Sequence, residues 1–164
     1  NKSHSQMNKI IPVITLCSTV IFTSITQAQP GTSAMSENKT IIREFIAAWS
    51  NLDPVELAAY FTDDGIYHNI PSNAVSGKEN IQNFIAGFIR PWQENEWEII
   101  SLVAEGDTVI AERIDKTVAA GQPVDLPVVG VFEMEGGKIK EWRDYFDLNT
   151  YVEQLNAALG QPSN

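Results

Sequence analysis

Three charged residues in the second half of the chain have types and spacings that suit proton transfer. Arg113 and Asp115 are separated by one residue in a segment with a strand pattern, so both side chains point to the same face. Asp144 lies between Trp142 and Phe146 at the same spacing, and an aspartate between two aromatic residues on a core face must be paired or hydrogen-bonded. Carboxylates held in this way can act as general acids or bases. The spacing alone does not bring Asp144 next to the other two residues.

Tyr67 and Asn69 form a second pair that shares one face of a short strand. Each of these residues also has an ordinary structural interpretation. Arg113 and Asp115 taken alone fit a surface ion pair, which contributes little to stability. Asp144 fits one more solvated charge, and Tyr67 fits a core or rim tyrosine. The chemical interpretation therefore depends on the residues acting together.

Metal and cofactor chemistry find no support in the sequence. The two histidines, His4 and His68, are too far apart in the sequence to suggest a metal site, and Cys17 is the only cysteine. No segment resembles a phosphate-binding loop or a Ser-His-Asp triad. We therefore expect no cofactor and no metal.

Length and charge narrow the class of protein. The chain has 164 residues, which favours one domain, and 43% of them are hydrophobic, which is enough for a real core. The formal net charge of −10 opposes binding to nucleic acid, whose phosphates need a basic surface. It also opposes docking on an anionic membrane face. We therefore expect no nucleic-acid partner and no docking on an anionic membrane, and the charge indicates little else about partners.

The N-terminal segment has the layout of a secretory signal peptide. A short basic start at Met7 precedes an apolar run, residues 10–25, and the small residues Thr26 and Ala28 predict cleavage after Ala28. Residues 1–6 lie upstream of this start. The apolar run is shorter than the ~18–20 residues of a membrane-spanning helix, and an uncleaved anchor is the alternative. We expect an exported protein, periplasmic or secreted, with no membrane contact after the leader is removed.

Beyond the leader at residues 1–28, we expect a linker at 29–36 and a single domain at 37–160. Helices are predicted at 41–49, at 54–61 and from Ser76 to Ile89, a turn at 62–65, strands at 66–70, 97–104, 108–117, 124–133 and 138–147, and a closing helix from Asn149. Helices followed by an antiparallel meander indicate an α+β fold. We expect a curved mixed or antiparallel sheet wrapped around the N-terminal helices, forming a cone with a deep apolar pocket.

Capping and turn residues support these boundaries. Asp53 before Pro54 and Ser76 before the third helix are predicted N-caps. Gly106 and Gly136 predict tight hairpin turns between neighbouring strands. The segment 90–98 is rich in charge and tryptophan and matches no pattern; we expect it to shape the mouth of the pocket.

Taken together, the polar residues resemble a known set. The pattern Tyr67-His68-Asn69, then Arg113-Ile114-Asp115, then Trp142-Arg143-Asp144-Tyr145-Phe146-Asp147-Leu148, resembles the limonene-1,2-epoxide hydrolase family. The resemblance covers residues 36–155, and its short motifs are specific in combination. The wider superfamily of nuclear-transport-factor-2-like and SnoaL-like proteins shares the cone but not this polar set.

The resemblance implies a role for each residue. Asp144 is the general base that deprotonates a water molecule, and Tyr67 and Asn69 hold that water. Asp115 is the general acid that protonates the epoxide oxygen, and Arg113 fixes both carboxylates. The implied activity is the one-step addition of water to a small hydrophobic epoxide, which gives a vicinal diol. The resemblance also implies a homodimer.

Two other classes of function remain open. A ketosteroid-isomerase-like or polyketide-cyclase-like enzyme on the same cone needs one base facing a carbonyl and an oxyanion donor opposite, so the arginine between two acids is superfluous there. A non-catalytic module would bind an apolar ligand and use the charged residues only for structure. Turnover of an epoxide separates the first hypothesis from both.

Overall fold

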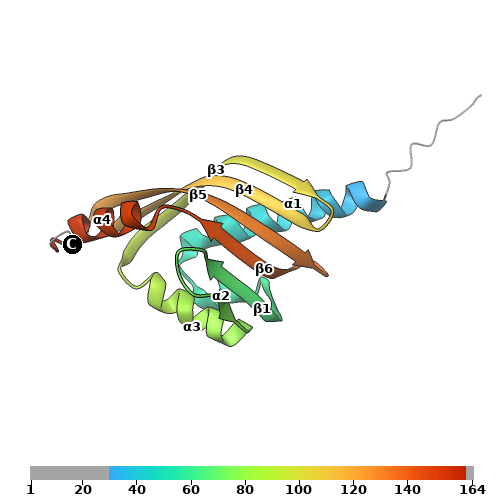
Figure 1. Ribbon diagram of the computed structural model, residues 1–164, viewed down its shortest axis with the longest axis horizontal. Helices are drawn as coiled ribbons and strands as arrows, with labels where there is room; N and C mark the ends of the chain where they lie inside the picture. The colour runs from blue at the N-terminus through green and yellow to red at the C-terminus, as the bar shows by residue number, and fades with distance from the viewer. Residues whose placement is uncertain (1–29, 162–164) are drawn as a thin grey trace, which may run out of the picture.

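The computed structural model describes residues 30–161 of the chain. The predicted signal peptide, residues 1–28, lies outside the described residues. Helices α1, α2 and α3 lie along the inner side of a bent sheet, and α4 lies at one end of it (Figure 1). Within residues 30–161, no helix is both long and apolar enough to cross a membrane.

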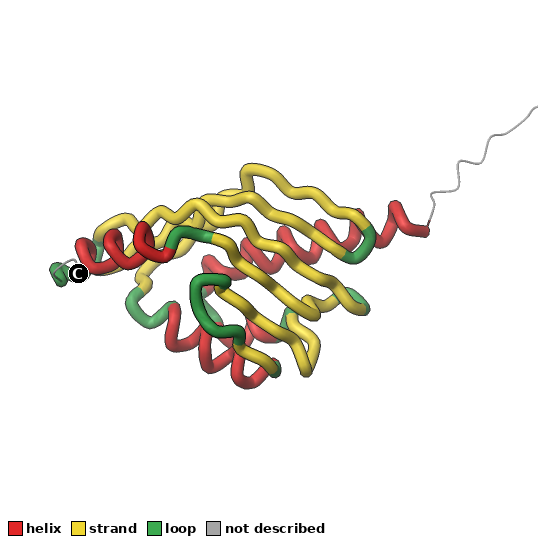
Figure 2. Tube along the Cα trace, in the orientation of Figure 1, coloured by secondary structure: helices red, strands yellow, loops and turns green. Residues whose placement is uncertain are grey.

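The sheet has six strands in the order β2-β1-β6-β5-β4-β3 and does not close into a barrel (Figure 2). The strands are β1 (Phe61–Asn69), β2 (Val75–Ser76), β3 (Trp92–Glu105), β4 (Thr108–Ala119), β5 (Gln122–Glu135) and β6 (Lys138–Tyr145). Neighbouring strands pair antiparallel, except that β1 and β6 run parallel. The predicted α+β fold with a curved mixed sheet is confirmed.

Two of the helices begin at aspartates whose side chains accept hydrogen bonds from free backbone N–H groups. The helices are α1 (Pro30–Ala48), the 3₁₀ helix η1 (Trp49–Asn51), α2 (Pro54–Ala58), α3 (Lys78–Phe88) and α4 (Leu148–Ala158). Asp53 has its predicted capping role, because its Oδ1 accepts from the backbone N–H of Val55 at 2.8 Å and of Glu56 at 3.3 Å. Asp147 caps α4 in the same way, accepting from the N–H of Thr150 at 2.6 Å.

The two predicted hairpin turns are present and depend on glycine. Gly106 connects β3 to β4 with a φ of 57°, and Gly136 and Gly137 connect β5 to β6 with φ of 56° and 75°. These left-handed conformations are strained for residues with a Cβ. Together with a third turn at Ala120 and Gly121 between β4 and β5, these turns make β3, β4, β5 and β6 successive neighbours.

Two helix starts differ from the sequence-based expectation. Residues 30–36, expected as a linker, form the first turns of α1. Pro30 fits the first turn of a helix, and the following residues include good helix formers, so the segment continues the helix. Ser76 does not cap α3: it pairs in β2, and Gly77, with a φ of 88°, is the residue before the helix.

The expected turn at 62–65 is instead part of β1. The pairing of β1 with β6 is irregular between Phe61 and Ile66, so the chain bends there without leaving the sheet. The exposed carboxylate of Asp63 pairs with Lys78 at 2.6 Å. The polar sequence that resembled a turn is therefore the solvent-facing part of an irregular strand.

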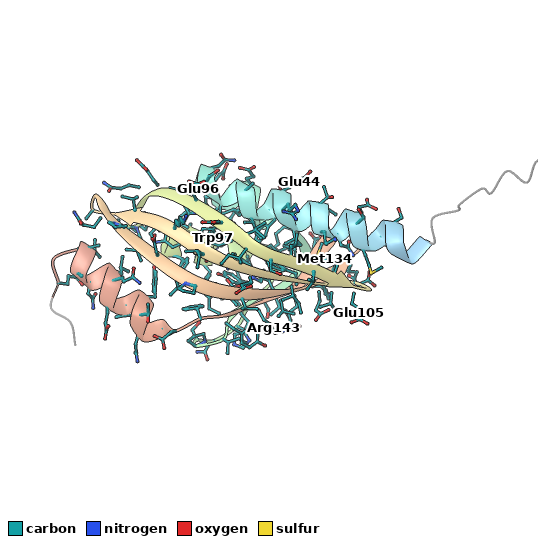
Figure 3. All side chains as sticks on the ribbon, turned by 90° about the horizontal axis from the view of Figure 1, so that it is seen from above. Glu44, Glu96, Trp97, Glu105, Met134 and Arg143 are labelled. Carbon is teal, nitrogen blue, oxygen red and sulfur yellow. The ribbon has the colours of Figure 1, made fainter. Side chains whose placement is uncertain are left out.

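Side chains fill the space between α1 and the sheet, as seen from above in Figure 3, and many of the buried ones are aromatic. Phe45 on α1 lies at the centre, with ring centroids 5.1 to 6.1 Å from those of Trp49, Phe61, Phe132 and Trp142, all in near-perpendicular contact. The inner face of β5 and β6 is thus the core face. Any charged residue on that face has to find its partners inside the protein.

Candidate active site

The alternation of strands β4 and β6 directs the predicted residues into the interior. Arg113 and Asp115 lie on β4 between outward-facing residues, and Asp144 lies on β6 two residues after the buried Trp142. Strand β5 runs between β4 and β6. Asp144 pairs in register with Gly130 of β5, so the arginine has to cross β5 to reach it.

Gly130 provides the space for that crossing. A Cβ at this position would lie 2.4 Å from Nη1 of Arg113 and 2.9 Å from Oδ1 of Asp144. Both distances are shorter than side chains tolerate, so only glycine lets the guanidinium lie flat over the middle strand. The role of Gly130 is steric and was not predicted from the sequence.

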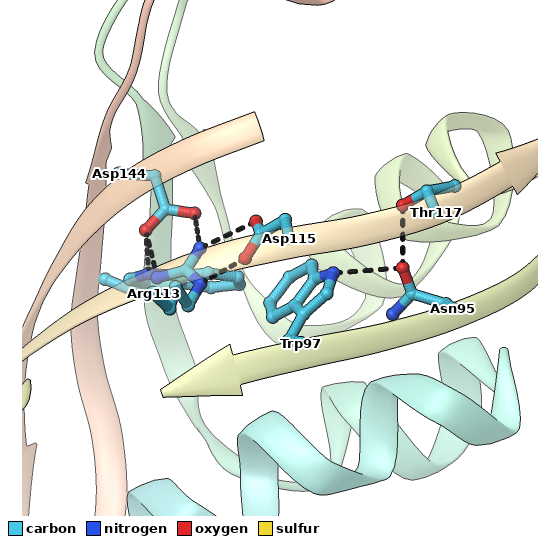
Figure 4. A network of polar contacts seen from close by, with 7 residues as sticks. Asn95, Trp97, Arg113, Asp115, Thr117 and Asp144 are labelled. Carbon is cyan, nitrogen blue, oxygen red and sulfur yellow. Dashed lines mark hydrogen bonds and ion pairs between the residues drawn. The ribbon is translucent and has the colours of Figure 1, made fainter. Parts of the chain in front are cut away.

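Arg113 binds both carboxylates by charge-assisted hydrogen bonds (Figure 4). Its Nε and Nη2 donate to Oδ1 and Oδ2 of Asp115 at 2.7 and 3.2 Å. Its Nη1 and Nη2 donate to Oδ1 and Oδ2 of Asp144 at 3.1 and 2.6 Å. The structure thus places Asp144 next to the other two residues, which the strand spacing alone could not do.

The buried cluster holds one positive and two potential negative charges. The side chain of Arg113 has no exposed surface, and those of Asp115 and Asp144 are 12% and 4% exposed. Burial raises the pKa of Asp115 to about 7: Arg113 opposes this rise and the charge of Asp144 adds to it. Burial also raises the pKa of Asp144, against the effects of Arg113 and of the indole N–H of Trp142. Two such acids lose their protons in two separate steps, and between these steps one carboxyl is neutral while the other is ionised.

Tyr67 and Asn69 reach the same site from β1. Because β1 runs parallel to β6, Tyr67 pairs with Trp142 and Asn69 pairs with Asp144. Both side chains are buried, and the ring of Tyr67 stacks on that of Trp142 with centroids 4.1 Å apart. Burial raises the pKa of the Tyr67 hydroxyl well above its ordinary value, and the nearby Asp144 adds to this, so the group stays a neutral donor.

These residues line one narrow cavity of about 20 Å³. Its polar wall consists of Tyr67, Asn69, Asp115 and Asp144, and its apolar wall consists of Phe88, Trp97, Leu126, Val128 and Phe146. Arg113 lies behind the carboxylates. The volume suits about one water molecule, and a larger hydrophobic molecule would fit only if the apolar wall moved. The expected apolar pocket is therefore narrow in this structure.

Trp97 is a site residue that the sequence did not reveal. The ring of Trp97 lies 4.6 Å from the guanidinium carbon of Arg113, which is a cation–π contact. Its Nε1 donates to Oδ1 of Asn95 at 3.0 Å, and Oγ1 of Thr117 donates to the same oxygen at 2.8 Å. Strand β3 begins at Trp92, before the predicted start at Trp97, and the correct start would have placed Asn95 and Trp97 on one inward face.

Comparisons with known proteins point to one family. Residues 42–142 match the model of the SnoaL-like domain. Epoxide hydrolase EphG of Mycobacterium tuberculosis is 31% identical over 127 residues, which are 76% of this chain and 83% of that protein. The solved structure of an M. tuberculosis LEH-like epoxide hydrolase is 28% identical, with a TM-score of 0.66 over 77% of this chain and 94% of that one.

The fold alone does not select the chemistry. A hypothetical protein with a ketosteroid isomerase-like fold from Catenulispora acidiphila, solved in complex with trimethylamine, is 24% identical and also has a TM-score of 0.66. The match covers 75% of this chain and 94% of the Catenulispora acidiphila chain. Because proteins of different description match the backbone equally well, the side chains in the cavity have to decide between functions.

We expect Gly130→Ala to destabilise the protein by about 1–3 kcal/mol, because the added methyl group overlaps Arg113 and Asp144 and forces them apart. The measurement is the urea concentration at the midpoint of unfolding. Gly87→Ala is the matched control: Gly87 is exposed on α3 with nothing within 4 Å of a new Cβ. That variant should be unchanged or more stable by up to about 1 kcal/mol. Equal midpoints for both variants would contradict the steric role of Gly130.

Proposed function

The chain belongs to the SnoaL-like domain family, and from this premise we propose that it is an epoxide hydrolase that adds water to a small hydrophobic epoxide to give a vicinal diol. One observation carries the proposal: a single buried arginine binds two aspartates that face one cavity. The similarity to the two mycobacterial epoxide hydrolases supports it.

The reaction needs an acid and a base at once. Water is a poor nucleophile unless a base takes its proton, and the epoxide oxygen leaves as an alkoxide unless an acid protonates it. Ionised Asp144 accepts the proton of water while the water oxygen bonds to a ring carbon. The ring carbon–oxygen bond breaks, and protonated Asp115 donates its proton to the ring oxygen. Proton transfer from Asp144 back to Asp115 then restores the starting state.

The surroundings of the two aspartates support this division of roles. Asp115, with a pKa raised to about 7, retains a proton near neutral pH. Asp144 accepts an additional hydrogen bond from Trp142, which favours its ionised form. Tyr67 and Asn69 lie beside Asp144 on the neighbouring strand, where their polar groups can orient a water molecule. The apolar wall opposite suits a hydrophobic substrate.

The two other classes of function need less than this site contains. An isomerase or cyclase needs one base and an oxyanion donor, and a second carboxylate bound to the same arginine adds nothing to that task. A binding module for an apolar ligand needs no buried acid, and removing two carboxyl groups from water is costly even when one arginine binds both. Both alternatives predict that no epoxide is hydrolysed.

We expect the purified domain to convert limonene oxide or cyclohexene oxide to the diol, and Asp144→Asn and Asp115→Asn each to lower kcat/KM by at least about 10²-fold. Asp125→Asn, the same chemical change at an exposed residue of β5, is the control and should retain activity. Diol formation is measured by gas chromatography. An inactive wild type, or an Asp144→Asn variant as active as the control, would rule the proposal out.

A single turnover in ¹⁸O-labelled water extends the same experiment to the mechanism. One-step attack by water puts the label into the diol in the first turnover. A covalent ester on an aspartate would instead transfer an unlabelled carboxylate oxygen to the diol and leave the label in the protein. Labelled protein would contradict the one-step route.

The pH dependence of kcat/KM should be bell-shaped. Activity requires protonated Asp115, so it should fall as pH rises through a pKa of about 7. It also requires ionised Asp144, so it should fall again as pH decreases through the pKa of that residue, which burial raises above its usual range. Rates on cyclohexene oxide across acidic to alkaline buffers test this. A rate that continues to rise above neutral pH would contradict Asp115 as the acid.

We also propose that the protein forms a homodimer through the outer face of the sheet. Ile100, Val129 and Tyr145 are 57%, 39% and 45% exposed and line one shallow groove across this face. Exposed apolar surface of this kind favours association.

Light scattering should give twice the mass of one chain, and Ile100→Glu should give a monomer. Val55→Glu, a change at a 59% exposed residue of α2, is the control and should remain dimeric. A monomeric wild type would contradict the proposal.

A further inference from the structure

Arg113 alone does not distinguish its two carboxylate partners. It donates two hydrogen bonds to Asp115 and two to Asp144, with the closest contacts at 2.7 and 2.6 Å. Its positive charge favours ionisation of both acids to a similar extent. A reaction that needs one neutral and one ionised aspartate therefore needs a second group that treats them differently.

The indole of Trp142 provides that difference. Its Nε1 donates a hydrogen bond of 2.6 Å to Oδ1 of Asp144, two residues further along the same face of β6. An indole N–H can only donate, so it favours the ionised form of Asp144, whose carboxylate oxygen is a stronger acceptor than an oxygen of the protonated acid. The carboxyl group of Asp115 has no such donor: within residues 30–161, Arg113 is its one hydrogen-bonding partner.

The donor is held rigidly in place. Trp142 has no exposed surface. Its ring lies between Tyr67 and Phe132, at centroid distances of 4.1 and 5.4 Å and interplanar angles of 6° and 16°. The three residues pair in register across β1, β6 and β5. The edge of Phe45 from α1 meets the same ring at 5.1 Å. Because this stack fixes the plane of the indole, its N–H cannot turn away from Asp144.

We infer that Trp142 is a positioning residue whose N–H makes Asp144 the base and leaves Asp115 to carry the proton. The inference rests on the proposed function and deepens it, because it attributes the different roles of the two aspartates to the hydrogen bond between Trp142 and Asp144. Without the N–H, the pKa of Asp144 rises towards that of Asp115, and the proton resides on Asp144 in a larger share of the molecules. Molecules with the proton on Asp144 have no base to activate water and are inactive.

The test is Trp142→Phe, which keeps an aromatic ring in the stack and removes the N–H. The carboxyl ¹³C resonance of Asp144 is followed through a pH titration of aspartate-labelled protein. A hydrogen bond to a charged group has a strength that corresponds to about one to two pKa units, so the Asp144 titration should move up by that amount. The acidic limb of the kcat/KM profile should move with it, while KM for cyclohexene oxide changes little.

Trp49→Phe is the matched control. Trp49 is equally buried and its ring packs against Trp142 at 5.8 Å, but its Nε1 has no hydrogen-bond partner in the described part of the chain. Loss of an indole from the core should therefore leave the Asp144 titration in place. If Trp142→Phe titrates as the wild type does, or if Trp49→Phe shifts Asp144 equally, the inference is overturned.

A measurement on the wild type covers the case in which Trp142→Phe does not fold. The indole ¹⁵N–¹H resonance of Trp142 should shift through the pH range in which Asp144 titrates, and a resonance that ignores this titration would overturn the inference. The titrations need no turnover. A shifted Asp144 together with no diol from either epoxide would therefore reject the proposed hydrolase and leave the effect of Trp142 on Asp144 standing.

Discussion

The charge balance between Arg113 and its two aspartates constrains the rest of the structure. One buried guanidinium offsets one carboxylate, so the cluster is most readily accommodated in a poorly hydrated interior when the second carboxyl holds a proton. Each group also needs its hydrogen bonds satisfied, which the four bonds from the arginine achieve. Removing either acid leaves two hydrogen bonds from the buried Arg113 without their acceptor, so stability and proposed chemistry depend on the same contacts.

The surrounding fold serves this cluster in two ways. Gly130 leaves the middle strand without a side chain, which lets the arginine span from β4 to β6. The aromatic core supplied by α1 and the sheet excludes water from the carboxylates and so raises their pKa values. The flat stack of Tyr67, Trp142 and Phe132 also fixes the direction of one donor. Packing therefore contributes to the electrostatics of the site and not only to stability.

The sequence predicted the parts of this arrangement that follow from local periodicity. The shared face of Arg113 and Asp115 and the hairpin at Gly136 are local features, and both are present. The approach of Asp144 depends on the width of β5 and on an absent side chain, which periodicity does not describe. Trp97 was missed because charged residues before it hid the true start of β3. The size of the cavity depends on how side chains from five strands and a helix meet, and no local pattern contains that information.

The residues of the site come together only when β1 pairs with β6. β1 is the first long strand of the chain, and β6 is the last, yet β6 lies between β1 and β5. Until β6 is in place, the sheet consists of two separate parts, with Tyr67 and Asn69 on one and Arg113 and Asp115 on the other. Contacts between residues so distant in the sequence form slowly during folding. The pairing of β6 with β1 therefore joins the two parts of the sheet and brings Tyr67 and Asn69 beside Asp144.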